Sequence, residues 1–280
     1  MRAVASSWAA EAASAIRWFE DELARRSATS VVDTSAGFTV LDAANPRVYE
    51  HNRLVVTRWA PAGAVLGEAE EVLGEAGLGH RRIDVMDTSL VPALTGPLLA
   101  GDYDLQILAV MVWGGPAPER DGASVEEVGL AEAQAVTASV WRRQLPGATE
   151  EVVAQLVGRL SVVEAACSAT HLAVRREGEV VASCHLYRLG TVAEIDAVAT
   201  EPAWRGQGLA SALVLDAVAR AVGSGCEVVF LRADTGDWPR RHYARLGFVE
   251  VGREHQFVRP DPASDVESRP GEDEGPAPRS

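Results

Sequence analysis

The chain has 280 residues, 47% of them hydrophobic and 24% charged, which is enough for one large globular domain or two small ones. All 26 basic residues are arginines, and without lysine the chain cannot form a Walker-type phosphate loop, a pyridoxal Schiff base or a protein-kinase site. The formal net charge of −14 argues against a nucleic-acid-binding protein, which would normally present a basic face to phosphates.

The cysteines and histidines indicate neither a disulfide framework nor a metal site. Cys167, Cys184 and Cys226 are odd in number and far apart, which is typical of reduced thiols in the cytoplasm. The six histidines show no ligand spacing, so we expect no metal. The longest apolar run, Ile107–Trp113, is too short to span a bilayer, and Glu11 interrupts the one candidate for an export signal. We therefore expect a cytoplasmic protein that does not bind a membrane.

The first 120 residues alternate between helical and extended patterns. Trp8, Ala12, Ile16 and Phe19 recur at three- and four-residue steps and predict an amphipathic helix over about residues 3–26. The further elements predicted are extended runs at Phe38–Leu41 and Leu54–Trp59, a helix at Ala64–Ala76, and a strand–helix–strand unit at Arg82–Val85, Leu90–Ala100 and Leu105–Trp113. Residues 114–122 are rich in glycine and proline, which indicates a linker, and we place a domain boundary at about residue 120.

The second half, residues 121–260, alternates more clearly between strands and helices. Strands are predicted at Val125–Leu130, Thr170–Arg175, Val180–Arg188, Ala193–Ala199, Val228–Arg232 and Phe248–Arg253, and helices at Ala131–Gln144, Thr149–Leu160, Leu209–Val222 and Pro239–Leu246. This pattern predicts an α/β (α+β) fold with a mixed, mostly antiparallel sheet and helices on both faces. Residues 261–280 have almost no large apolar side chain, so we expect a disordered tail that is acidic and rich in proline.

One segment of the second half has the features of a phosphate-binding loop. The predicted strand Ala193–Ala199 leads into Arg205-Gly206-Gln207-Gly208-Leu209-Ala210, which opens an amphipathic helix. The two glycines would let the backbone approach a ligand closely, and the first amides of the helix would point at it, where the helix dipole favours an anion. A pyrophosphate is the natural ligand of such a loop.

Two motifs of this half resemble those of the GNAT superfamily of acetyl-CoA-dependent N-acetyltransferases. The segment Val198–Gly208 is similar to the strand and pyrophosphate loop of that family, and Arg240–Phe248 is similar to its later Tyr-x-x-Leu-Gly-Phe signature. The order of elements from Val125 to Arg253 also matches the family. The resemblance covers about half of the chain and implies a GNAT-like fold for the C-terminal half.

This resemblance implies acetyl-CoA as co-substrate and no metal. Val198, Ala199 and Thr200 match the strand whose main-chain groups hold the pantetheine arm and the acetyl carbonyl. The backbone of the loop would hold the pyrophosphate, and its residues are Arg205, Gly206, Gln207, Gly208, Leu209 and Ala210.

Acetyl transfer to an amine also needs a base for the ammonium proton and an acid for the departing thiolate. Glu194 lies four residues before Val198, where some members of the family place a glutamate base, and Asp196 is a second candidate on the same face of a regular strand. A β-bulge here, which is common in the family, could turn one of them away. Tyr243 matches the tyrosine that acts as general acid in the family. The alternatives are an ordinary acid pair for the two carboxylates and a packing role for the tyrosine. His171, His185 and Tyr187 lie on the neighbouring strands. His185 and Tyr187 share one strand face and could line the acceptor pocket, although the pattern favours a hydrogen-bonded structural role for each histidine.

The first half, residues 1–120, carries no such glycine loop. Its strand–helix–strand unit resembles the last part of a GNAT domain, so we interpret it as a smaller, degenerate GNAT-like half without a cofactor site. An unrelated α/β domain is an equal alternative.

We therefore predict an enzyme, an acyltransferase of tandem GNAT organisation. It would move an acetyl group from acetyl-CoA to the primary amine of a small molecule or peptide by direct transfer in a ternary complex, since no cysteine or serine is placed as a covalent relay. The alternative is a non-catalytic, regulatory module that binds acyl-CoA. The sequence does not identify the acceptor or the oligomeric state.

Overall fold

The computed structural model describes residues 2–118, 125–236 and 238–262. Within them the chain forms one 11-stranded sheet in the order β1-β2-β3-β4-β11-β5-β10-β9-β8-β7-β6. Eight of the ten neighbouring strand pairs are antiparallel, and the parallel ones are β3–β4 and β9–β10. The mixed, mostly antiparallel sheet expected from the sequence is thereby confirmed.

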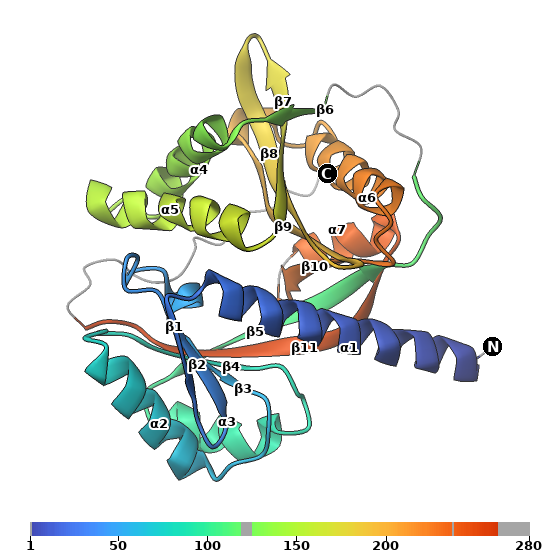
Figure 1. Ribbon diagram of the computed structural model, residues 1–280. Helices are drawn as coiled ribbons and strands as arrows, with labels where there is room; N and C mark the ends of the chain where they lie inside the picture. The colour runs from blue at the N-terminus through green and yellow to red at the C-terminus, as the bar shows by residue number, and fades with distance from the viewer. Residues whose placement is uncertain (1, 119–124, 237, 263–280) are drawn as a thin grey trace, which may run out of the picture.

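The first half contributes three helices and five strands (Figure 1). Their bounds are α1 (Arg2–Ser27), β1 (Ser30–Asp33), β2 (Gly37–Leu41), β3 (Arg53–Val56), α2 (Ala62–Glu75), β4 (Arg81–Val85), α3 (Val91–Ala100) and β5 (Asp104–Trp113), with a short 3-10 helix η1 (Tyr49–His51) before β3. The sequence patterns did not predict β1 or η1. All four residues of β1 are exposed at the edge of the sheet, so no buried alternation marks this strand.

The second half contributes the remaining elements. They are β6 (Val125–Val128), α4 (Leu130–Gln144), α5 (Glu150–Ala166), β7 (Ser168–Arg176), β8 (Glu179–Leu189), β9 (Val192–Thr200), η2 (Pro202–Trp204), α6 (Leu209–Gly223), β10 (Val228–Asp234), α7 (Trp238–Leu246) and β11 (Phe248–Arg259). Strand β11 runs to Arg259, beyond the predicted end at Arg253, because its second part pairs with both β4 and β5. Residues 263–280 of the expected tail and residues 119–122 of the expected linker lie outside the described residues.

The two halves exchange their last strands. Strand β11, the last of the second half, lies between β4 and β5, and β5, the last of the first half, lies between β11 and β10. Around this exchange each half repeats one arrangement: a strand and helix lead to a parallel strand (β3-α2-β4 and β9-α6-β10), and a second helix leads to the exchanged strand. A tandem organisation, as expected from the sequence, would produce such a repetition and stays a prediction.

Helices cover both faces of the sheet. In the second half, α6 and Tyr243 of α7 belong to the core on one face, whereas α1 and α5 pack on the other face around Phe19, Phe230 and Tyr187. In the first half, α2 and α3 cover one face and the end of α1 lies over the other at Phe38. Helix α1 therefore spans the junction of the two halves (Figure 1).

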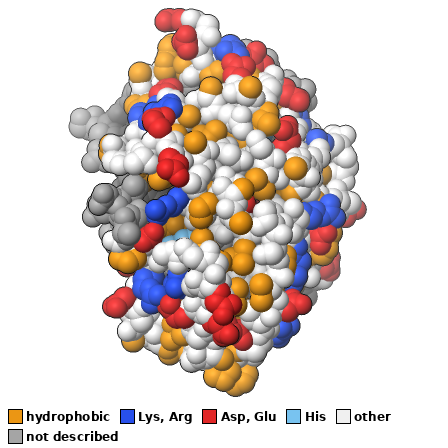
Figure 2. Space-filling model, turned by 60° about the vertical axis from the view of Figure 1, so that its left-hand side comes forward, with side chains coloured by type: hydrophobic (Ala, Val, Ile, Leu, Met, Phe, Trp, Pro, Cys, Tyr) orange, Lys and Arg blue, Asp and Glu red, His pale blue; other side chains and the backbone are white. Residues whose placement is uncertain are grey.

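Arginine and acidic side chains lie beside one another over the face shown in Figure 2. Exposed ion pairs of the chain include that of Arg142 with Glu150 and those of Arg175 with Glu126 and Glu132. Such exposed pairs each contribute little to stability.

Candidate functional site

The predicted phosphate loop has the backbone that an anion cradle needs. Gly206 and Gly208 both adopt left-handed conformations, with φ of 76° and 78°, which L side chains rarely adopt. Gly208 is the N-cap of α6, and its carbonyl accepts the amide of Ala212. The amides of the first turn of α6 have no acceptor within the helix by geometry, so they are available to an anion.

Strands β9 and β10 part next to this loop. Their parallel pairing extends from Val228 opposite Val192 to Leu231 opposite Ile195, although β9 continues to Thr200 and β10 to Asp234. Past this point the edge of β9 that faces β10 is open, and it includes Val198, Ala199 and Thr200. An extended ligand can bind there through main-chain hydrogen bonds, as a further strand would.

A β-bulge occurs in β9 just where the strands part. The register between β8 and β9 shifts between Ser183 and His185, and Ala197 has a positive φ of 51°, an unusual conformation for alanine. The bulge lies after Asp196, so Glu194 and Asp196 remain on one face of the sheet and neither is turned away.

Glu194 is buried and ion-paired. Its side chain is 2% exposed, and its Oε1 lies 2.5 Å from Nη2 of Arg232 on β10. Burial raises the pKa of Glu194 to about 7 against the lowering effect of Arg232, and the neighbouring charges of Asp196 and Glu50 add to the rise. A carboxyl group with this pKa exchanges a proton near neutral pH.

Asp196 is more accessible, and its Oδ2 lies 3.0 Å from Nη1 of Arg159 on α5. Arg159 also binds Glu50 of η1, with Nε 2.9 Å from Oε2. The sequence did not single out Arg159 or Glu50 because they lie far from β9 in the chain.

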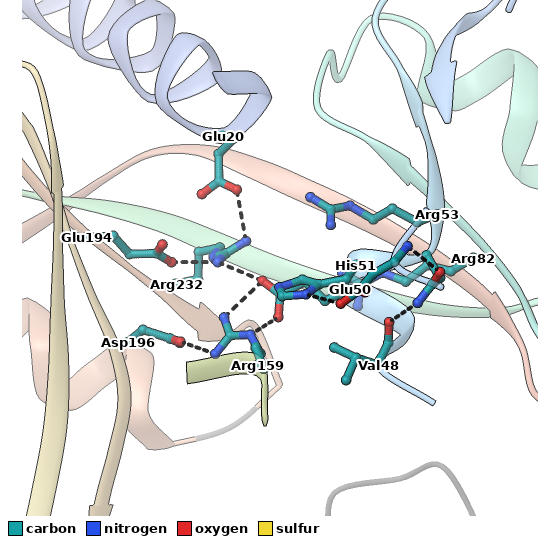
Figure 3. A network of polar contacts seen from close by, with 12 residues as sticks. Glu20, Val48, Glu50, His51, Arg53, Arg82, Arg159, Glu194, Asp196 and Arg232 are labelled. Atoms are coloured by element: carbon teal, nitrogen blue, oxygen red, sulfur yellow. Dashed lines mark hydrogen bonds and ion pairs between the residues drawn. The ribbon is translucent and has the colours of Figure 1, made fainter. Parts of the chain in front are cut away.

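The same cluster extends to two further elements, α1 and β11, and Figure 3 shows Glu20 of α1 beside Arg232. Arg232 Nη1 lies 3.2 Å from Glu254 of β11 and 3.4 Å from Glu20 of α1, and its Nη2 lies 3.9 Å from Glu50. Burial is the main reason that the pKa of Glu20 is well above its usual value, although Arg232 opposes it. The junction of the two halves thus holds Glu20, Glu50, Glu194, Asp196 and Glu254 around two guanidinium groups.

The two histidines and the tyrosine of the neighbouring strands lie beside this cluster. In the strand register His185 is opposite Asp196 and Tyr187 is opposite Glu194. The Nδ1 atoms of His171 and His185 are 3.0 Å apart, and burial lowers the pKa of His185 to about 4, so this ring is neutral at pH 7. The hydroxyl group of Tyr187 is buried and makes no hydrogen bond in the structure.

Tyr243 belongs to the core on the α6 face, so it does not join the carboxylate cluster. Its ring contacts the rings of His242 and Phe248, and it is 9% exposed. Burial raises the pKa of its hydroxyl well above the usual range, and the nearby Cys184 and Asp196 add to the rise. The hydroxyl is therefore a proton donor at neutral pH. Cys184 itself is buried, and burial likewise raises the pKa of its thiol, which does not suit a nucleophile.

The described residues present neither a cluster of metal ligands nor a helix that could span a membrane. They contain no group of three or more histidine, cysteine, aspartate or glutamate side chains arranged to hold a metal ion. None of the helices among them combines the length and the apolar composition needed to cross a membrane.

The open edge of β9 and the glycine loop at the start of α6 can together receive an extended ligand with an anionic group, beside the carboxylates of β9. Residues 139–248 match the sequence profile of the acetyltransferase (GNAT) family, which confirms the resemblance that the motifs of this half indicated. No curated protein matches the sequence.

Solved structures share the fold over most of the chain. A GCN5-related N-acetyltransferase from Kribbella flavida is 18% identical, with a TM-score of 0.60 over 92% of this chain and 98% of that one. A conserved protein of unknown function from Staphylococcus epidermidis is 13% identical, with a TM-score of 0.66 over 84% and 94% of the two chains. A tandem GNAT protein of the clavulanic acid biosynthesis pathway is 15% identical, with a TM-score of 0.52 over 72% and 70%. At these identities the likeness concerns the fold.

Proposed function

We propose that the protein is an N-acetyltransferase that moves an acetyl group from acetyl-CoA to a primary amine in a ternary complex. The observation that carries this proposal is the juxtaposition on β9. The strand opens an edge beside a left-handed glycine loop, and the same strand bears a buried carboxyl group whose pKa is about 7. The loop residues Arg205 to Ala210 would hold the pyrophosphate, and Val198 to Thr200 the pantetheine arm.

In this proposal Glu194 is the general base and Tyr243 the general acid. Glu194 takes a proton from the acceptor ammonium, directly or through water, and the free amine attacks the thioester carbonyl. When the carbon–sulfur bond breaks, the hydroxyl group of Tyr243 gives its proton to the CoA thiolate, and the proton that the attacking nitrogen then loses restores the hydroxyl group. Asp196 is the alternative base, since it is more exposed and lies on the same face.

The ion pair between Glu194 and Arg232 favours a second candidate function. A carboxylate that is held 2.5 Å from a guanidinium can serve the fold alone. The chain would then be a regulatory module that binds acyl-CoA without turnover.

We also propose a cytoplasmic location, where the cysteines Cys167, Cys184 and Cys226 remain reduced.

Release of thiol from acetyl-CoA with a panel of primary amines separates the two functions. Gly208→Asp tests whether the glycine loop at the start of α6 binds the pyrophosphate. The new carboxylate would clash with the pyrophosphate and repel it, and the aspartate would have to adopt a positive φ. We expect binding of acetyl-CoA, measured by calorimetry, to disappear in this variant, whereas Gly178→Asp on the turn before β8 retains it. Binding without amine-dependent thiol release in the unmodified protein would support the regulatory module.

A further inference from the structure

Glu50 connects the first half of the chain to the candidate site. It lies on the short helix η1 between β2 and β3, with its side chain 29% exposed. Both carboxylate oxygens bind Arg159 of α5, at 2.9 Å from Nε and 3.1 Å from Nη2. This two-point contact fixes the plane of the guanidinium group.

Each arginine that Glu50 contacts reaches one carboxylate of β9. Arg159 lies 3.0 Å from Asp196, and Arg232, whose Nη2 is 3.9 Å from Glu50, lies 2.5 Å from Glu194. Figure 3 shows the carboxylate of Glu50 between the two guanidinium groups. A residue of the first half thus holds both cations that face the proposed base and its neighbour.

We propose that Glu50 is a positioning residue of the acetyl-transfer site, supplied by the first half of the chain, which shares Arg159 with Asp196 and Arg232 with Glu194. The inference rests on the proposed function of Glu194 as general base. It gives the first half, which carries no glycine loop before α2, a part in the reaction.

The charges around the base define what Glu50 does. The ionisable groups around Glu194 come from every element packed against it: Glu20 of α1, Glu50 of η1, Arg159 of α5, Cys167 at the end of α5, Tyr187 of β8, Asp196 of β9, Arg232 of β10 and, through Arg232, Glu254 of β11. Glu50 repels the charged form of Glu194 and draws the two guanidinium groups toward itself. Both effects oppose ionisation of Glu194 and keep it a stronger base.

Glu50→Gln removes both effects and keeps the shape of the side chain. We expect the acid limb of the pH profile for kcat/KM to move to lower pH by roughly one unit, since the repulsion is lost and Arg232 no longer shares its charge with Glu50. The plateau of kcat should fall several-fold because the base is weaker, whereas the KM for acetyl-CoA should not change. Loss of a merely structural contact would lower activity without moving the limb.

Glu70→Gln is the matched control. Glu70 of α2 also bridges two arginines of the sheet, Arg81 and Arg259, but it is not part of the cluster around Glu194. We expect this variant to retain the profile of the unmodified protein.

A titration that does not depend on turnover separates this inference from the proposed function. In protein labelled with ¹³C at the glutamate carboxyl groups, the signal of Glu194 is assigned by its loss in Glu194→Gln. Its midpoint should fall in Glu50→Gln and not in Glu70→Gln. A lower midpoint in a protein that transfers no acetyl group would retain the role of Glu50 and refute the proposed reaction.

An unchanged midpoint and an unchanged acid limb in an active Glu50→Gln enzyme would overturn the inference. If that variant does not fold, Glu50→Asp replaces it, because the shorter side chain withdraws the carboxylate and should shift the midpoint in the same direction by less. No shift in Glu50→Asp would overturn the inference as well.

Discussion

Replacing Glu194 with glutamine tests the proposed chemistry most directly. The pKa of about 7 means that about half of the molecules carry an ionised Glu194 at pH 7 and about a tenth at pH 6. Below pH 7 the kcat/KM of the unmodified enzyme should therefore fall about tenfold per pH unit. In Glu194→Gln no base remains, and we expect kcat to fall by roughly 10²–10⁴-fold at neutral pH.

The structure indicates that this variant still folds. Arg232 keeps Glu20, Glu50 and Glu254 as partners, so the substitution does not leave a buried cation alone. A glutamine oxygen can also accept the hydrogen bond that Arg232 donates. Circular dichroism and the affinity for acetyl-CoA, measured by calorimetry, serve as controls that the loss is one of turnover.

The pH dependence carries the decisive information. A base is needed only while the acceptor is an ammonium ion, so the deficit of Glu194→Gln should shrink as rising pH supplies free amine. Initial rates of thiol release from pH 6 to pH 9.5 measure both profiles. Full activity of Glu194→Gln at pH 7 would refute the assignment and leave Asp196 as the next base to test. A deficit of the same size at every pH would show that Glu194 acts in some other way than by removing the amine proton.

Two more substitutions test single groups. Tyr243→Phe keeps the packing of the ring and removes the proposed acid, so the kcat for thiol release should fall and high pH should not rescue it. The affinity for acetyl-CoA, measured by calorimetry, should not change. A fully active variant would show that Tyr243 is a packing residue only. His80 is buried, donates through Nε2 to the carbonyl of Asn52 at 2.9 Å, and has its pKa lowered by burial to about 4. Because the unfolded state binds the proton from about pH 6.5 downward, the free energy of unfolding should decrease as pH falls from 6.5 to 4, by up to about 1.4 kcal/mol per unit for this one group. Urea unfolding at pH 7, 6 and 5 should show a shallower dependence in His80→Gln, and an equal slope would contradict the buried, neutral histidine.

The parts of the site that lie within one stretch of chain were predictable from sequence. Gly206 and Gly208 have the positive φ that a tight loop before a helix requires, and α6 begins at Leu209 as expected. The shared face of Glu194 and Asp196 follows from the two-residue period of a strand. Their catalytic roles, and that of Tyr243, stay predictions.

The partners of these carboxylates were not predictable, because they come together only in the folded sheet. Arg159 and Arg232 lie on a helix and a strand 35 residues before and 38 residues after Glu194, and Glu50 lies in a segment without periodicity. Local patterns record which side chains are buried but not which buried charges meet. An arginine at an otherwise apolar strand position, as at Arg232, is the one signal that could have indicated a buried ion pair.

The exchange of β5 and β11 was likewise hidden from local patterns, and it bears on the division of the chain at about residue 120. Strand β5 pairs with β11 from Val258 opposite Asp104 to Phe248 opposite Trp113, and with β10 from Asp234 opposite Leu108 to Phe230 opposite Val112. Without residues 1–118, β11 loses both of its neighbours and β10 loses one. The buried side chains of Met111 and Val112 also leave the cores on the two faces.

We therefore expect residues 125–280 to aggregate when produced alone, since they expose three unpaired strand edges and cores that lack part of their apolar side chains. Residues 1–118 should behave in the same way, because β4 and β5 lose β11 from between them. Produced together, the two fragments should associate one to one, as light scattering after size-exclusion chromatography would show, and recover the binding of acetyl-CoA. The expectation would be refuted if fragment 125–280 were monomeric and melted cooperatively at the melting temperature of the whole chain. The exchanged strand β5 would then be dispensable, and the residues on the two sides of the boundary at about residue 120 would fold independently.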